Sequence, residues 1–386
     1  MSKLDKSTYV FMHKFFNAIA DSIIKVFVPL IIFKLTGNIF FAFLYLGTQS
    51  LLSGLFNILF KKFIIKYGVI AIILHIFPAI ATLFILTLCS LNFWLVLLLG
   101  FLQSLFQVLY SVPINIIFAM SDKKTNVAKL EIATNIGKFV FIILNGYILG
   151  SSLSSSLWII TSVGTLFYIL SILPILYSFK MLKNSYDIPT PKYKNVYGKK
   201  YKYFNLFHIC FGIFQYVLDH ILPLYLYIND LSMESISLIL ALIEVAKLIA
   251  NYTAKYLISR KKGFVGCCIC VALFITSSVM IIFVKLPIVL YVLSCVLGIS
   301  FPLIFVPMFS CFCKCLKLNN DMNSEMLKRD VCVLTPRSLF IGSYFLFNSF
   351  YGFFGIGIVV SLVMLISSAK IYEQSEDEKL LEIILS

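Results

Sequence analysis

The sequence predicts an all-α membrane protein of about 12 transmembrane helices, arranged as two pseudo-symmetric six-helix bundles with both termini cytoplasmic. Of its 386 residues, 60% are hydrophobic and only 13% are charged, which is more apolar surface than a soluble fold can bury. Apolar stretches of about 20 residues recur along the chain, and each is long enough to cross a hydrocarbon core of about 30 Å. The period-2 alternation typical of membrane strands is absent, so the spans are predicted to be helices.

The first apolar segment contains Asn17, Asp21 and Lys25, so it is too polar and too long for a cleaved signal peptide and is expected to remain as the first span. The predicted spans are residues 8–33, 38–60, 68–90, 92–119, 130–150, 156–179, 203–228, 234–257, 263–284, 287–311, 331–351 and 353–371.

The net charge of +15 is explained by orientation in a membrane, not by nucleic-acid binding. Basic residues gather in alternate loops, as at 61–66, 123–124, 180–202 and 260–262, whereas the opposite loops hold little more than Lys34 and Lys285. Lysine and arginine concentrate on the cytoplasmic side of membrane proteins, so both termini are expected there. The Lys-, Ile-, Phe- and Asn-rich composition suggests a bacterial cytoplasmic (inner) membrane, with the lipid bilayer as the protein's first partner.

A polar, lysine-rich stretch divides the chain into equivalent parts. We predict a six-helix half at residues 1–180, a basic cytoplasmic linker at 181–202, a second half at 203–372 and an acidic cytoplasmic tail at 373–386. A shift of 194 residues, the separation of Pro29 from Pro223, also aligns Asn57 with Asn251, and Val112-Pro113 with Val306-Pro307. An ordered series of matches indicates an internal duplication.

Two six-helix halves of the same orientation, joined by a basic loop, resemble the major facilitator superfamily of secondary transporters. The family's loop between helices 2 and 3 carries an Asp, which helps to latch one conformation, but Lys61 stands there in this chain, so the latch must differ or be absent. The segment 145–150, with Gly146 and Gly150, resembles the signature of the family's drug antiporters. Residues 35–38, Leu-Thr-Gly-Asn, likewise resemble macrolide-type exporters. These likenesses favour efflux.

Charged side chains inside membrane spans normally face a cavity or a partner. In the first span Lys14, Asn17, Asp21 and Lys25 are spaced by three or four residues, which places them on one stripe of a helix. Asp21 lies near the middle of the span. It forms either a static ion pair with Lys25 or a proton site, and we select it as the leading proton-coupling candidate.

The second half supplies two further proton-coupling candidates. In the seventh span His208, Gln215 and Asp219 follow a helical stripe, and Asp219 is a candidate carboxylate. In the eighth span Glu244 and Lys247 are separated by one turn, and they form either a structural pair or a coupling site.

Lys138 and Arg337 occupy equivalent positions in the fifth and eleventh spans. They either extend to the membrane surface or form a cationic pair that faces an anionic substrate group. Together with Lys14, Asn17, Lys25, His208, Gln215 and Lys247 they complete the predicted substrate cavity. The third, sixth, ninth and twelfth spans carry no deep charge, and in the family that the sequence resembles these four are outer supports.

The sequence therefore predicts a secondary active transporter for a small solute, working by alternating access and coupled to protons, with no cofactor and no metal. No phosphate-binding loop or metalloprotease pattern is present. The run Cys311, Cys313, Cys315 lacks zinc-site spacing. A transporter-like sensor or lipid-handling protein is the alternative, and an integral membrane enzyme comes after it. The substrate, the direction of transport and the oligomeric state are not deducible from the sequence.

Overall fold

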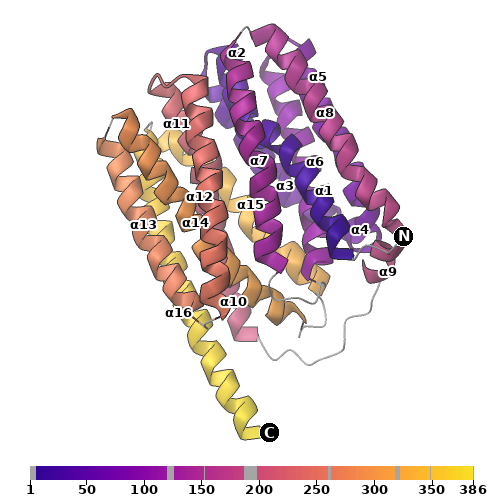
Figure 1. Ribbon diagram of the computed structural model, residues 1–386, viewed down its shortest axis with the longest axis vertical. Helices are drawn as coiled ribbons and strands as arrows, with labels where there is room; N and C mark the ends of the chain where they lie inside the picture. The colour runs from indigo at the N-terminus through magenta and orange to yellow at the C-terminus, as the bar shows by residue number, and fades with distance from the viewer. Residues whose placement is uncertain are drawn as a thin grey trace.

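The computed structural model describes residues 6–119, 126–151, 153–186, 198–259, 262–284, 286–317, 322–347 and 349–385. Within these ranges the chain is helical apart from short turns, and it contains no strand. The helices run side by side along the long axis of the molecule, and the last helix extends beyond the bundle (Figure 1). The all-helical prediction is confirmed.

The helices before the predicted linker lie over the six predicted spans of the first half. They are α1 (Lys6–Asp21), η1 (Ser22–Phe27), α2 (Val28–Thr36), α3 (Ile39–Leu59), α4 (Lys61–Leu74), α5 (Ile76–Leu88), α6 (Phe93–Ala119), α7 (Asn126–Gly150), α8 (Leu153–Tyr177) and α9 (Phe179–Tyr186).

The helices after the linker follow the same pattern. They are α10 (Gly198–Tyr216), η2 (Val217–Ile221), α11 (Leu222–Ile228), α12 (Met233–Ser259), α13 (Gly263–Phe283), α14 (Pro287–Lys317), α15 (Met322–Phe347) and α16 (Phe350–Leu385).

Several boundaries differ from the predicted ones. α4 begins at Lys61, seven residues before the predicted span; the backbone then leaves helical geometry at Tyr67, with φ −125° and ψ 32°. The pair α4–α5 is bent by 41°. Helices α9 and α10 occupy both ends of the predicted linker, whose residues 187–197 lie outside the described part. α16 continues through the predicted tail as far as Leu385.

Hydropathy supports a multi-pass membrane protein. Among the described residues seven helices are long and apolar enough to cross a membrane, and the bent pair α4–α5 would make an eighth. The helices over the predicted spans 8–33, 130–150, 234–257 and 331–351 do not meet this criterion by themselves, and they carry the charged candidates other than Asp219. Twelve crossings therefore remain a prediction.

Two π-helical segments support the internal duplication. η1 ends at Phe27 and η2 ends at Ile221, positions that the 194-residue shift makes equivalent. Each is followed by a helix with proline in its first turn, Pro29 in α2 and Pro223 in α11. η1 and η2 also contact each other. π-turns are rare and frequently mark functional sites. Hydrophobic composition alone therefore does not explain why two of them stand at equivalent positions.

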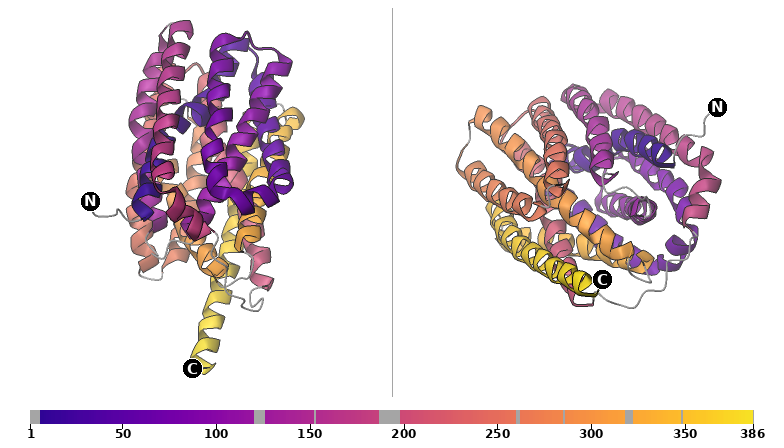
Figure 2. Two further views of the ribbon diagram at one scale, coloured as in Figure 1. Left: turned by 90° about the vertical axis from the view of Figure 1, so that its right-hand side faces the viewer. Right: turned by 60° about the horizontal axis from the view of Figure 1, so that its bottom comes forward.

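Glycines set the closest contacts between helices from the two parts of the chain. α7 packs along α12 and α3 packs along α15 (Figures 1 and 2). A Cβ added at Gly146 would overlap the Ser237 side chain, and one added at Gly150 would overlap Glu234. The glycines that resemble the antiporter signature therefore allow α7 to approach α12. Small residues at helix interfaces serve this purpose in membranes.

The contact between α10 and α15 gives a direct test of this packing. A Cβ at Gly212 would overlap the backbone carbonyl of Val333, which cannot rotate away, whereas a Cβ at Gly342 would meet nothing within 4 Å. We expect Gly212→Ala to lower the free energy of unfolding by about 1–3 kcal/mol. Gly342→Ala should leave it unchanged or raise it by up to about 1 kcal/mol. Denaturant unfolding in detergent measures both, and equal stability of the two variants would contradict the packing.

Candidate functional site

A continuous chain of polar contacts crosses the middle of α10–η2, α12 and α15. Arg337 donates from Nη2 to Gln215 Oε1 at 2.9 Å, and Gln215 donates from Nε2 to Asp219 Oδ2 at 3.1 Å. The Lys247 ammonium lies 3.7 Å from Asp219 Oδ1 and 2.8 Å from Glu244 Oε1. The side chains of Lys247 and Glu244 are each 6% exposed, and that of Asp219 is 26% exposed. We call these five residues, with Lys138, the α12 cluster.

Helices from the first part of the chain reach the α12 cluster. Lys138 lies on α7, which packs along α12. The Arg337 guanidinium lies 5.2 Å from the ring centroid of Tyr216. The Tyr216 hydroxyl donates to the Leu46 carbonyl of α3 at 3.1 Å and accepts from Ser50 at 3.2 Å. The cluster therefore lies where helices from both parts of the chain meet.

The sequence left two roles open for Arg337, extension to the membrane surface or a position inside the bundle, and its buried side chain decides between them. Its side chain is buried, and Nε donates to the Gly212 carbonyl at 3.1 Å. It consequently points into the bundle and does not extend to the membrane surface. Lys138 is half-buried.

A second group of buried polar side chains surrounds α1, and we call it the α1 cluster. It comprises His13, Asn17 and Asp21 of α1 with His75, Tyr110 and Tyr168. Asp21 accepts from the Tyr168 hydroxyl at 3.2 Å, and His75 Nε2 lies 2.8 Å from Asn17 Oδ1. The rings of His75 and Tyr110 are 4.8 Å apart, and Lys14 Nζ lies 4.9 Å from the Tyr110 centroid. These contacts join α1 to α5, α6 and α8.

His75 lies at the break between α4 and α5, and both of its ring nitrogens face oxygen atoms. Nδ1 contacts the Ile72 carbonyl and Nε2 faces Asn17 Oδ1. A doubly protonated ring donates to both oxygens, whereas a neutral ring requires the Asn17 amide to turn and donate to Nε2. The orientation of the Asn17 amide and the tautomer of His75 are therefore set together.

The remaining predicted residues lie elsewhere. His208 is buried against Phe204 and Phe312, so the structure does not bring it to either cluster. The side chain of Lys25 lies outside the described residues. Sequence reasoning missed four members of the α1 cluster. His13 lies on α1 but was not selected, and His75, Tyr110 and Tyr168 are distant in sequence from α1 and show no helical spacing with its polar residues.

Lys61, which replaces the family's Asp, contacts α15. Its ammonium donates to Ser324 Oγ at 2.9 Å. Nearby Asp330 accepts from Ser111 of α6 at 2.5 Å and pairs with Arg329 at 2.7 Å. These contacts join α4 and α6 of the first part of the chain to α15 of the second.

No metal site is formed in the described part of the chain, where no group of three or more His, Cys, Asp or Glu side chains is placed to hold an ion. All ten cysteines are free thiols.

Sequence comparison identifies the family. The model of the Major Facilitator Superfamily matches residues 10–321, which is most of the chain. The chain belongs to the Major Facilitator Superfamily. A search of curated proteins found no match. Membership indicates a membrane transporter and not an enzyme.

Solved transporter structures share the fold. A bacterial homologue of the iron transporter ferroportin, in an outward-facing state with soaked iron, has a TM-score of 0.70 at 13% identity and covers 95% of this chain and 99% of its own. The human organic anion transporter MFSD10 has a TM-score of 0.66 at 12% identity, with 93% and 98% covered. The E. coli fucose:proton symporter FucP has a TM-score of 0.59 at 13% identity, with 95% and 98% covered.

Removal of Lys247 tests the charge balance of the α12 cluster. Lys247→Met leaves Asp219 and Glu244 without their shared cation, so we expect the free energy of unfolding to fall by about 3–5 kcal/mol. Lys255→Met, at an exposed position of the same helix, should change it by no more than about 0.5 kcal/mol. The double variant Lys247→Met/Glu244→Met should recover at least half of the loss. Thermal unfolding in detergent measures all three, and equal stability of the two single variants would contradict this balance.

Proposed function

We propose that this protein is a proton-coupled secondary active transporter that moves a small organic anion across the cytoplasmic membrane by alternating access. The α12 cluster is the observation that carries the proposal. It combines three cationic side chains with two carboxylates, and helices from both parts of the chain contribute to it. In a transporter built of two halves that move against each other, a solute binds where the halves meet.

The charges of the α12 cluster favour an anion. Lys247 lies between two carboxylates, whereas the hydrogen bonds of Arg337 described above go to neutral acceptors, Gly212 and Gln215. Arginine recognises carboxylate and phosphate groups through paired N–H donors. The human organic anion transporter MFSD10 shares this fold.

Three carboxylates are candidates for proton coupling. Asp21 is 4% exposed and accepts a hydrogen bond from the Tyr168 hydroxyl in the α1 cluster. Asp219 and Glu244 share Lys247, so protonation of either carboxylate weakens its hold on that ammonium. The E. coli fucose:proton symporter FucP provides a precedent for proton coupling in this fold. We select Asp21 as the principal coupling residue.

We propose export as the direction, with protons moving inward. The resemblance of residues 145–150 to drug antiporters supports this direction. In this arrangement both termini face the cytoplasm. The family membership does not favour the sensor or lipid-handling alternative.

A screen of solutes tests the substrate class. We expect mono- and dicarboxylates, sugar phosphates or sulfonated dyes to stabilise the purified protein against heat, and matched cations and neutral sugars to have no effect. A ligand at 100 times its dissociation constant adds about 2.7 kcal/mol to the stability. Arg337→Gln should lose this stabilisation, while Arg337→Lys should retain only part of it. Stabilisation by neutral sugars alone would exclude the anionic class.

Substitution of Asp21 tests the coupling. In proteoliposomes, Asp21→Asn should abolish accumulation of the identified solute under an imposed proton gradient, because the side chain no longer exchanges a proton. Gradient-free exchange of the same solute should persist, since the α12 cluster is intact. Glu373→Gln, which alters an exposed carboxylate of α16 outside both clusters, is the control. Full gradient-driven activity of Asp21→Asn would transfer the coupling role to Asp219 or Glu244.

A further inference from the structure

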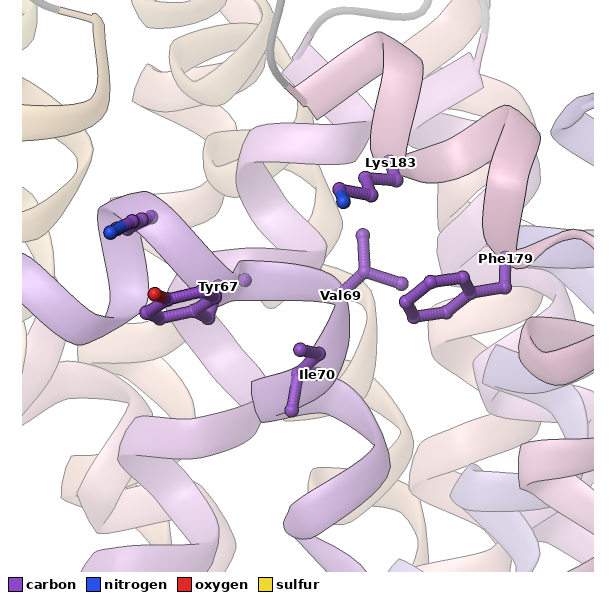
Figure 3. A pocket seen from close by; sticks show the side chains of 7 residues that line it. Tyr67, Val69, Ile70, Phe179 and Lys183 are labelled. Atoms are coloured by element: carbon purple, nitrogen blue, oxygen red, sulfur yellow. The ribbon is translucent and has the colours of Figure 1, made fainter.

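A hollow of about 310 Å³ lies on the outside of the bundle, away from both polar clusters. Five lining residues come from α4 and two from α9. Figure 3 shows the Phe179 ring beside Val69, and the Lys183 ammonium extending toward the same hollow. Lys66 completes the polar part of the rim, with its ammonium 5.0 Å from the centroid of the Tyr67 ring. The lining is Lys66, Tyr67, Gly68, Val69, Ile70, Phe179 and Lys183.

The local backbone produces this shape. α4 leaves helical geometry at Tyr67, so the lysine-rich turn 61–66 and the apolar stretch that follows do not share one straight axis. On the other side, α9 follows directly after α8 and packs against α4. The kink and the short helix together form the two walls of the hollow.

The hollow lies at a membrane boundary. The predicted third span begins at residue 68, and the apolar candidate span Ser155–Tyr177 ends two residues before Phe179. The lysines therefore lie on the polar side of this boundary, while Val69, Ile70 and Phe179 lie at its edge. The groups of a bilayer at this level are the lipid headgroups and the first part of the acyl chains.

The residues around the hollow match an amphiphilic anion. Two exposed lysines, Lys66 on α4 and Lys183 on α9, line the hollow, and lysine binds phosphate as a point charge. The Tyr67 hydroxyl supplies a further donor, and tyrosine is common at this level of membranes. Val69, Ile70 and Phe179 offer apolar contact to an acyl chain. A soluble phosphate would contact only the lysines and the Tyr67 hydroxyl, and would leave the apolar residues of the lining without a partner.

We propose that this hollow is a binding site for an anionic phospholipid of the leaflet on the linker side, with the lipid phosphate between Lys66 and Lys183 and an acyl chain against Val69, Ile70 and Phe179. The site is independent of the α12 and α1 clusters. Its occupancy fixes α9, and with it the beginning of the linker, against α4.

Native mass spectrometry of the full-length protein in detergent tests the site with phosphatidylglycerol as the probe. We expect Lys66→Gln/Lys183→Gln to weaken the first phosphatidylglycerol binding event about fivefold to tenfold. Lys255→Gln/Lys262→Gln, which removes two exposed lysines at α12 and α13, should leave it unchanged. Phosphatidylcholine should bind all three proteins equally. An equal loss in both double variants would show that binding follows net charge alone, and would overturn the proposal.

A local fluorescence measurement keeps the proposal testable by a second route. In a variant with Trp94→Phe and Trp158→Phe, Tyr67→Trp places the only indole at the hollow. Brominated phosphatidylglycerol in nanodiscs should quench it at least twice as strongly as brominated phosphatidylcholine, and Lys66→Gln/Lys183→Gln should remove the difference. Excess glycerol phosphate should not restore the emission, because it lacks the acyl chain. Restoration by glycerol phosphate, or equal quenching by the two lipids, would overturn the assignment to a lipid.

Discussion

The burial of Lys247 between two carboxylates is the interaction on which the arrangement of the central helices depends. A charged side chain near the middle of a bilayer costs roughly 2.5–3.5 kcal/mol on insertion scales, and this ammonium is almost entirely enclosed. Glu244 lies one turn away on the same helix, but Asp219 must come from η2. Gln215 then joins Asp219 to Arg337 of α15. The polar chain therefore holds α10–η2, α12 and α15 together at one level.

The sequence predicted most members of this series of polar contacts, because charges inside membrane spans are few and each needs a partner. Helical spacing predicted the pair Glu244–Lys247 and the stripe that contains Gln215 and Asp219. The internal repeat showed that Lys138 and Arg337 occupy equivalent positions. The bridging role of Gln215 was not deducible, because it depends on how α10 is rotated toward α15.

The α1 cluster was predicted only in part, for physical reasons that can be named. The stripe Asn17–Asp21 was visible in the spacing, but its partners are remote: His75 follows Asn17 by 58 residues and Tyr168 follows Asp21 by 147. A histidine in an apolar span has no periodic signature of its own. The π-turn that follows Asp21 also changes the register of the helix, so a stripe drawn at 100° per residue does not continue reliably to Lys25.

The same π-turns relate the two clusters to each other. Asp21 is the last residue before η1, and Asp219 lies inside η2. η1 and η2 are in contact, so the backbone segments that hold the two carboxylates adjoin although the clusters differ in surroundings. A π-turn carries one residue more than the α-helical turn it replaces, and its hydrogen bonds can return to the i→i−4 pattern with a small rotation of the helix. Under the proposed function, a change of charge at Asp21 that alters η1 acts directly on η2 and on the position of Asp219 beside Lys247. Coupling between proton and solute then requires no relay of side chains between the clusters.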